Sequence, residues 1–475
     1  MTVLLPFVIN AGLNFVLGLL IALFLGPAEF GRYAIGAAII VLVNTAMLDW
    51  VKLSAVRFYS LKSREEQPEI RATLDVLAAG ISIALSGLLV AAIIAGIDFR
   101  LPAMLLAAAV LGGIGAGLFD YHGAIARARF LDAAYARLII IKNLVALVLM
   151  VGGAWLTKDP TVVLLGGLVS VAVALLAVRR ALADGPVSLK AARSDLARQF
   201  LLYGLPLVAG NAIYSLIPLI NRSLLAASYG YAEAGYFSLA SDMGLRLFGT
   251  LGATIEIVLL REIIRLDETR GRLAAQKRIA KNIPLVLLIA LPVAAGFWAV
   301  LPAFDRLIVP PSFQGRFAGY MTLLLPGFAA ITLFQAALYP VFLIGKRTLI
   351  ATLVALLALA VNVALAFALL PSLGPAAYGW GQSAGLLTVL VVTTAVALRA
   401  LPVPPAWRDC ALVLLAAAVM AAAIWPLRDR FAAPLELVLQ VTLGALVYVG
   451  VILMSDAARC RTNLRLWWMT QKMRR

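Results

Sequence analysis

Long apolar runs are the feature that most constrains this chain. Runs of about 20 residues, each long enough to cross a bilayer as a helix, recur through almost the whole sequence. In lipid, every backbone N–H and C=O group needs a partner within the protein, so such runs form helices. With 63% hydrophobic and 13% charged residues, the sequence predicts an all-α polytopic membrane protein. We expect fourteen spans, at residues 3–25, 33–56, 72–97, 102–124, 137–157, 160–178, 201–226, 235–260, 282–303, 319–343, 349–370, 377–398, 409–427 and 434–454.

Basic residues between the runs predict the orientation of these helices. Of the 40 Lys and Arg residues, 31 fall in one set of alternate loops with the adjoining helix ends and the C-terminal tail, and seven fall in the opposite loops. Such an excess marks the cytoplasmic side. We therefore expect a multi-pass membrane protein with both termini in the cytoplasm. The net charge of +17 follows from this topology, and nucleic acid is not an expected partner.

Two similar segments open the two halves of the chain. The prolines Pro6 and Pro206 correspond at an offset of 200 residues, and the turns that contain Glu29 and Glu233 correspond at an offset of 204. Such matched openings predict a duplicated fold. Six spans precede the repeat, so two six-helix lobes would surround a central cleft, related by a pseudo-twofold axis along the membrane normal. The expected parts are an N-lobe at 1–180, a cytoplasmic connector at 181–200, a C-lobe at 201–400, two further spans within 401–458 and a basic cytoplasmic tail at 459–475.

Three charged residues lie well inside the apolar helices of 205–246. A charge at the centre of a bilayer costs about 2.5–3.5 kcal/mol on insertion scales and usually faces a cavity or a partner. At about 1.5 Å per residue, Arg246 lies about 16 Å below the outer end of its span, with Asp242 one turn above it; Arg222 lies nearer the outer surface. Arg246 and Arg222 are candidate anion-binding residues and Asp242 a candidate coupling residue. A purely structural Asp242–Arg246 ion pair explains the pattern equally well.

Asparagines within the spans add weaker candidates for substrate binding. Asn10 and Asn14 are four residues apart in the first span and share a helix face, and Asn211 lies in the seventh. Asparagine side chains also join helices to one another by hydrogen bonds, and the sequence favours that role here.

Other motifs predict no enzymatic chemistry. The glycine run at 112–117 lies inside a span, where small residues allow close helix packing. The single histidine, His122, stands beside Asp120 without the neighbours of a metal site, and a hydrogen-bonded helix end is favoured over a proton relay. The longest external loop, about 304–318, has Asp305 as its only acid and is too short for a catalytic domain. We expect no cofactor, no metal and no catalytic residues.

Basic segments are expected to lie along the cytoplasmic face of the membrane. The stretches 188–200, 261–281 and 459–475 mix basic with apolar residues, a composition that suits an anionic leaflet. In 188–200, Leu189, Leu196 and Phe200 are expected to form one apolar stripe of an amphipathic helix. Anionic lipids are therefore expected partners, with topology anchoring as the simpler role. Asp49, Lys52 and Glu256 lie near the same ends of their spans and are expected to extend to the interface.

Several loose motifs, in order and spacing, resemble those of the oligosaccharide-lipid flippases. These form the polysaccharide transporter branch of the multidrug/oligosaccharidyl-lipid/polysaccharide exporter superfamily. The resemblance covers most of the chain up to about residue 400. It implies a two-lobe transporter with a cationic cavity, which flips undecaprenyl-diphosphate-linked sugars from the inner to the outer leaflet by alternating access. An ion gradient, of H⁺ or Na⁺, or the membrane potential would drive the transport. The motifs are Leu25-Gly26-Pro27-Ala28-Glu29-Phe30-Gly31-Arg32-Tyr33, Tyr203-Gly204-Leu205-Pro206, Glu233-Ala234-Gly235-Tyr236-Phe237-Ser238-Leu239-Ala240 and Leu373-Gly374-Pro375-Ala376-Ala377-Tyr378-Gly379.

Three alternatives stay open at this point. The lipid II flippase branch also has fourteen spans, but its arginine-rich first helix is missing here. A multidrug or cation antiporter of the same superfamily would favour an acidic cavity, whereas this core has two arginines against one aspartate. A non-transporting scaffold that binds polysaccharide assembly proteins is the most distant alternative.

The predicted topology can be tested with two single cysteines. In a protein whose Cys410 and Cys460 are replaced by serine, we expect Ser312→Cys to react with an impermeant thiol reagent in intact cells. Ser194→Cys should react only after the cells are opened. Labelling of position 194 alone from outside intact cells would reverse the predicted orientation.

Overall fold

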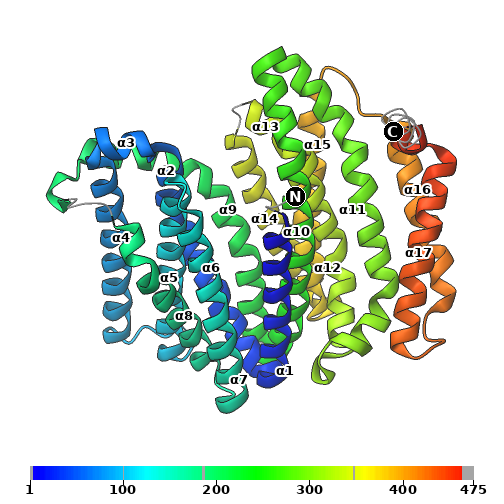
Figure 1. The fold of residues 1–475 in the computed structure, drawn as a ribbon. Helices are drawn as coiled ribbons and strands as arrows, with labels where there is room; N and C mark the ends of the chain where they lie inside the picture. The colour runs from blue at the N-terminus through cyan, green and yellow to red at the C-terminus, as the bar shows by residue number, and fades with distance from the viewer. Residues whose placement is uncertain (1–3, 100, 184–187, 346–347, 463–475) are drawn as a thin grey trace. The chain divides into compact units, whose positions relative to one another are not determined.

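The computed structural model describes residues 4–99, 101–183, 188–345 and 348–462, and side chains from residue 12 onward within these ranges except that of Thr348. All regular secondary structure in these ranges is helical (Figure 1). Residues 184–187 of the predicted connector, most of the basic tail and the side chain of Asn10 lie outside the described parts. The all-α prediction is confirmed.

The chain divides into two compact units. We call Val16–Ser238 the N-unit, and Met1–Phe15 together with Leu239–Arg475 the C-unit. The two boundaries fall inside the helices α1 (Leu4–Val43) and α10 (Tyr231–Arg270). The units therefore do not coincide with the predicted lobes, since the seventh predicted span lies in the N-unit. The lobe boundaries at 180 and 400 stay predictions.

In the N-unit, α5 and α8 form the centre of a helical bundle. Helix α8 packs against α5 and α6, and α2 packs against α5 and α9 (Figure 1). A core of Trp50, Tyr59, Tyr121 and Phe200 fills the space among α2, α4, α5 and α9. The remaining helices of this unit are α2 (Asp49–Phe58), α3 (Leu61–Glu66), α4 (Pro68–Ile94), α5 (Ala103–Ala128), α6 (Asp132–Ala146), α7 (Gly152–Thr157), α8 (Pro160–Leu182) and α9 (Ser194–Tyr229), with π-helical turns η1 (Asn44–Leu48) and η2 (Leu147–Val151) and a 3₁₀ turn η3 (Leu189–Ala191).

In the C-unit, α15 packs against α12 and α14, and α11 packs against α12, α16 and α17. Arg428 joins the last two helices to α11, because its guanidinium lies over the rings of Trp298 and Trp425 and donates to the Ala299 carbonyl at 2.8 Å. The elements are α11 (Arg272–Ile308), α12 (Arg316–Leu333), α13 (Tyr339–Ile344), α14 (Thr348–Leu373), α15 (Ala376–Ala400), α16 (Trp407–Ile424) and α17 (Ala433–Ser455), with the π-helical turn η5 (Phe334–Leu338) and the 3₁₀ turns η4 (Pro311–Phe313), η6 (Trp425–Leu427) and η7 (Ala457–Arg459).

Twelve helical segments among the described residues are long and apolar enough to cross a membrane. One of them, Gly12–Phe58, contains residues 12–25 of the first predicted span and all of the second, and α10 contains the eighth predicted span although it is not among the twelve. The predicted count of fourteen therefore agrees approximately with the structure. Helix α10 also continues past residue 260 to Arg270, so much of the basic connector expected at 261–281 is helical.

The segment expected to be amphipathic at 188–200 is not one continuous helix. A 3₁₀ turn ends at Ala191, and Arg193 has an extended backbone before α9 begins. Leu189 is 62% exposed, whereas Phe200 is fully buried in the N-unit core. The predicted common apolar stripe is therefore wrong, because the break in the backbone separates its two ends.

A repeated backbone break marks the two matched openings. Gly26 interrupts α1 with φ 71° and ψ 174°, and Gly230 separates α9 from α10 with φ 87° and ψ 165°. Both values of φ lie in the region that favours glycine. The two glycines are 204 residues apart, the offset that the sequence repeat predicts, and both lie in the N-unit.

The helices that follow these two glycines cross at backbone contact distance. A Cβ atom on Gly31 would clash with the carbonyl oxygen of Tyr231, and a Cβ atom on Gly235 would clash with the carbonyl oxygen of Pro27. Gly31 and Gly235 are 204 residues apart, and so are Pro27 and Tyr231, the residues that they contact. Each of the two contacts is therefore the repeat of the other. Such a reciprocal contact is what a local twofold axis produces, and it supports the predicted pseudo-twofold relation.

The glycine run in α5 serves close packing, as the sequence predicted. A Cβ atom on Gly113 would overlap the side chain of Val43, and one on Gly117 would overlap that of Leu48. Helix α5 therefore lies against the end of α1 and the π-helical turn η1, which brings the polar residues of these elements close to one another.

The crossing predicts that Gly→Ala substitutions at different positions differ in their effect on stability. We expect Gly31→Ala and Gly235→Ala each to destabilise the purified protein by about 1–3 kcal/mol, because the added methyl group overpacks a rigid backbone contact. Gly80→Ala and Gly87→Ala in α4 are matched controls, since a Cβ atom at either position meets no other atom within 4 Å. Thermal unfolding midpoints in detergent measure the effect. A loss of stability in the α4 controls equal to that at the crossing would contradict the steric explanation.

Candidate functional site

Arg246, a predicted site residue on α10, contacts the backbone of α1. It lies near the middle of α10, is partly buried, and donates a hydrogen bond from Nη1 to the main-chain oxygen of Asn14 in α1. Both residues belong to the C-unit. The structure thus brings together two candidates that are 232 residues apart in sequence, through the backbone of Asn14.

Asp242 lies one turn before Arg246 on α10 and is also partly buried. Its neighbour Ser241 is fully buried and accepts a hydrogen bond at 3.4 Å from the side-chain amide of Gln382 on α15. Asn362 on α14 and Ser383 on α15 are buried as well. The position before Asp242 on α10 therefore contacts a polar side chain of α15. The coupling role of Asp242 stays a prediction.

Arg222 has a different environment. It lies on α9 in the N-unit with only 3% of its surface exposed, and its Nη1 donates to the carbonyl oxygen of Ala34 in α1 at 3.0 Å. Asn211 lies three turns earlier on α9 with an exposed side chain, and its main-chain oxygen accepts from Ser215. The contact of Arg222 fastens α9 to α1 and gives this arginine a structural role.

The six predicted site residues therefore divide between the two units. Arg246, Asp242 and Asn14 belong to the C-unit, as does Asn10, whose side chain is outside the described parts. Arg222 and Asn211 belong to the N-unit. The hypothesis that Arg222 assists Arg246 at one ligand stays a prediction.

Sequence reasoning gave little weight to an ion-pair network in the N-unit. Lys52 on α2 pairs with Asp49 at 2.6 Å and with Asp120 on α5 at 3.6 Å, and Asn44 donates to Asp120 at 3.2 Å. Asn44 begins the π-helical turn η1, and such a turn shifts the direction of the side chains that follow it. Lys52 is thus paired with two carboxylates within the unit, and the expectation that it extends to the interface stays a prediction.

A second polar cluster in the N-unit surrounds Arg71 at the start of α4. Its Nε donates to both carboxylate oxygens of Asp75, at 3.0 and 2.9 Å, and the hydroxyl of Tyr121 donates to Asp75 at 2.6 Å. The guanidinium of Arg71 lies 5.8 Å from the ring centres of Tyr59 and Tyr121. Beside this cluster, His122 donates from Nδ1 to the Leu118 carbonyl oxygen at 2.8 Å, which is the hydrogen-bonded helix end that the sequence favoured.

The C-unit contains a carboxylate with an amide partner. Gln335, in the π-helical turn η5, donates to Glu256 on α10 at 3.0 Å. Glu256 lies 204 residues after Lys52, the same offset that relates Glu233 to Glu29. This correspondence was present in the sequence and could have identified both residues as members of one repeated position. Among the described residues, no group of three His, Cys, Asp or Glu side chains could hold a metal ion.

Known proteins share this fold. A family model described as "Polysaccharide biosynthesis protein" matches residues 20–308, and no curated protein matches significantly. The solved structure of lipid II flippase MurJ in an inward closed conformation has a TM-score of 0.74 and 12% identity, covering 95% of this chain and 99% of that chain. A multidrug resistance MATE family transporter of the MOP superfamily, in its inward-facing conformation, has a TM-score of 0.59 and 14% identity, covering 82% and 94%.

The MATE transporter also matches in its outward-facing conformation, with a TM-score of 0.57, 14% identity and coverage of 83% of this chain and 94% of that chain. At these identities the likeness is one of fold. The family model, in contrast, covers more than half of the sequence. The protein is therefore a multi-pass membrane protein of the polysaccharide biosynthesis protein family, with the fold of the MurJ and MATE transporters of the MOP superfamily.

Proposed function

We propose that this protein flips an undecaprenyl-diphosphate-linked oligosaccharide from the inner to the outer leaflet of a bacterial inner membrane. The family match supports a role in polysaccharide biosynthesis, and the fold supports transport by alternating access, driven by an ion gradient or by the membrane potential. The matched solved proteins are a flippase and transporters, which favours transport over an enzymatic role or a scaffold.

The single observation that carries the proposal is the position of Arg246. It is a partly buried arginine near the middle of a membrane helix, and the partner described for it is a neutral main-chain oxygen. A phosphate oxygen is a stronger acceptor than a carbonyl oxygen, because charge-assisted hydrogen bonds are about twice as strong as neutral ones. An arriving diphosphate can therefore replace the Asn14 carbonyl, and the planar guanidinium suits two phosphate oxygens at once.

Asp242 would couple this binding event to an energy source. While the site is empty, the positive charge one turn away stabilises the carboxylate. When Arg246 turns toward the diphosphate, Asp242 takes up a proton or a sodium ion in its place. One charge that crosses a potential of 100 mV contributes about 2.3 kcal/mol, enough to favour one direction of transport.

Lipid II is the second candidate substrate. MurJ, named as a lipid II flippase, matches 95% of this chain at a higher TM-score than the MATE transporter does. Lipid II is also a lipid-linked diphosphate, so Arg246 would have the same role in either case. Flipping assays with both substrates in proteoliposomes, and with a cationic dye for the antiporter alternative, would separate the three.

Substitution of Arg246 tests the proposal directly. We expect Arg246→Ala to lower the flipping rate by about 10- to 100-fold or more, since hydrogen bonds to charged groups contribute about 1.5–3 kcal/mol. Arg246→Lys should recover only part of the rate, because lysine keeps the charge but loses the two-pronged geometry. Arg261→Ala, at an exposed position farther along α10, is the matched control. The measurement is flipping of lipid-linked oligosaccharide in proteoliposomes, with thermal stability recorded for each variant.

The same variants distinguish a loss of substrate binding from a loss of folded structure. If Arg246→Ala transports normally at wild-type expression, Arg246 serves only to hold α1 and α10 together, and the proposed site is wrong. If Arg246→Ala loses transport but also unfolds, Arg246→Lys decides, because it can keep the contact to the Asn14 carbonyl.

Asp242→Asn tests the coupling step. We expect the variant to bind lipid-linked oligosaccharide about as tightly as wild type, while its transport no longer responds to an imposed proton or sodium gradient, because the neutral amide cannot take up a proton and lacks the negative charge that holds a sodium ion. Transport measured with and without each gradient checks this expectation. An unchanged response to both gradients would remove Asp242 from the coupling mechanism.

A further inference from the structure

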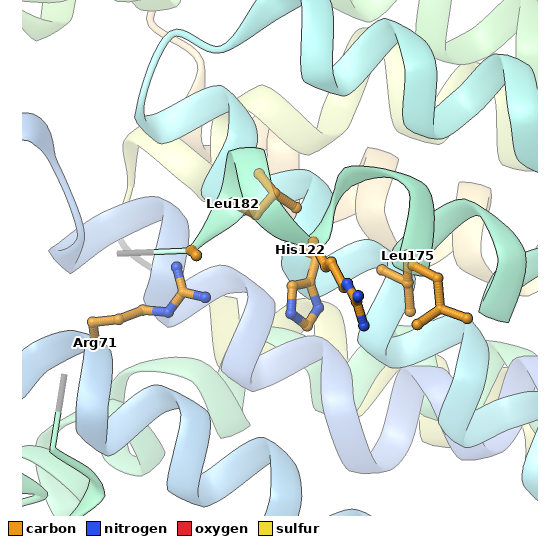
Figure 2. A pocket seen from close by; sticks show the side chains of 7 residues that line it. Arg71, His122, Leu175 and Leu182 are labelled. Carbon is orange, nitrogen blue, oxygen red and sulfur yellow. The ribbon is translucent and has the colours of Figure 1, made fainter. Parts of the chain in front are cut away.

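A pocket in the N-unit lies apart from the residues proposed for transport. It has a volume of about 240 Å³ and is formed where the end of α8 meets α4 and α5. The residues that line it are Arg71, His122, Leu175, Leu176, Arg179, Leu182 and Ala183. The described lining thus combines two arginines and a histidine with apolar side chains and contains no carboxylate. The guanidinium of Arg71 is directed toward the end of α8, near Leu182 (Figure 2).

Arg71 is fixed in place before any ligand arrives. The side chain is more than nine-tenths buried, and the two hydrogen bonds from its Nε to Asp75 leave one edge of the guanidinium committed to that carboxylate. Tyr121 in turn holds Asp75, and the rings of Tyr59 and Tyr121 lie next to the guanidinium. A positive group held by its neighbours loses little conformational entropy on binding an anion.

The pocket lining combines two kinds of side chain. Arg71 on α4 and Arg179 on α8 supply donors that suit phosphate oxygens, since the guanidinium fork matches phosphate geometry. Helix α8 also supplies leucines, of which Leu176 is 60% exposed on the surface of the unit. A ligand that satisfies both kinds carries a phosphate group next to an apolar chain.

The sequence places this pocket at the cytoplasmic surface of the membrane. Arg71 ends the basic loop at 57–71, Arg179 begins the basic segment at 179–200, and His122 lies just before the basic loop at 125–137. These loops belong to the side that carries 31 basic residues. Anionic lipids are concentrated in that leaflet, and basic pockets between transmembrane helices bind their headgroups.

We infer that this pocket binds the phosphate group of an anionic phospholipid from the cytoplasmic leaflet. Arg71 and Arg179 hold the phosphate, while Leu175, Leu176 and Leu182 contact the adjoining glycerol and acyl chain. The bound lipid fixes the end of α8 against α4 and α5. The site is separate from the proposed transport residues and does not depend on which substrate the protein transports.

Neighbouring arginines provide a matched test. Arg179 and Arg180 both lie exposed in the last turn of α8, but only Arg179 lines the pocket. In wild-type protein purified in neutral detergent, we expect added phosphatidylglycerol to raise the thermal midpoint and to stay bound in native mass spectrometry, whereas phosphatidylcholine should do neither. Arg179→Gln should weaken phosphatidylglycerol binding about tenfold, the loss expected for a charged hydrogen bond, and Arg180→Gln should leave it unchanged.

Further measurements distinguish a phospholipid from free phosphate, and lipid binding from a purely structural role of Arg71. Stabilisation by inorganic phosphate alone would support the phosphate site but assign it to a soluble anion. Equal losses in Arg179→Gln and Arg180→Gln would overturn the inference in favour of diffuse surface charge. Arg71→Lys should also weaken lipid binding; if it lowers the midpoint equally with and without phosphatidylglycerol while binding persists, Arg71 only stabilises the end of α8 and the inference is wrong.

Discussion

The reciprocal contact between Gly31 and Gly235 is the constraint on which the N-unit depends. Two helices can approach this closely only where neither carries a Cβ atom, and each follows a glycine whose positive φ turns the chain into the crossing. Other interactions then fasten the same elements. The guanidinium of Arg32 lies 4.8 Å from the ring centre of Tyr231, and Arg222 reaches the carbonyl oxygen of Ala34, one turn beyond Gly31. Close backbone packing therefore brings the buried Arg222 within hydrogen-bond distance of its acceptor.

Burial distinguishes Arg222 from Arg246, although both looked alike in the sequence as charges inside apolar helices. Both donate to a main-chain oxygen of α1, but Arg222 is almost fully buried whereas Arg246 is only partly buried. A ligand can compete for the guanidinium of Arg246 by offering a charged acceptor in place of a neutral one. To reach Arg222, the same ligand would have to separate α9 from α1 and expose packed apolar surface. The proposed diphosphate site therefore depends chiefly on Arg246, while the described contact of Arg222 fastens α9 to α1 and its predicted help in binding stays a prediction.

Much of the fold was predictable because it depends on local properties of the chain. Apolar run length predicted the spans, and the repeat offset of 204 predicted the paired breaks at Gly26 and Gly230. The pairing of Asn44 with Asp120, and of Gln335 with Glu256, was not predictable. Both amides lie in π-helical turns, whose extra residue rotates the following side chains away from the positions that regular helical spacing gives. The two candidate arginines were predictable as intramembrane charges, but their described acceptors are main-chain atoms, which leave no sequence signal.

The duplicated fold has also diverged in charge at equivalent positions. Lys52 and Glu256 are related by the repeat offset, yet the first pairs with two carboxylates and the partner described for the second is the amide of Gln335. A membrane potential acts on opposite charges in opposite directions. Two halves related by an axis along the membrane normal face the potential in the same direction, so identical charges in them would respond alike and their effects would add. A lysine in one half and a glutamate at the equivalent position of the other remove this equivalence, so that two halves with similar backbones differ in how they respond to a potential.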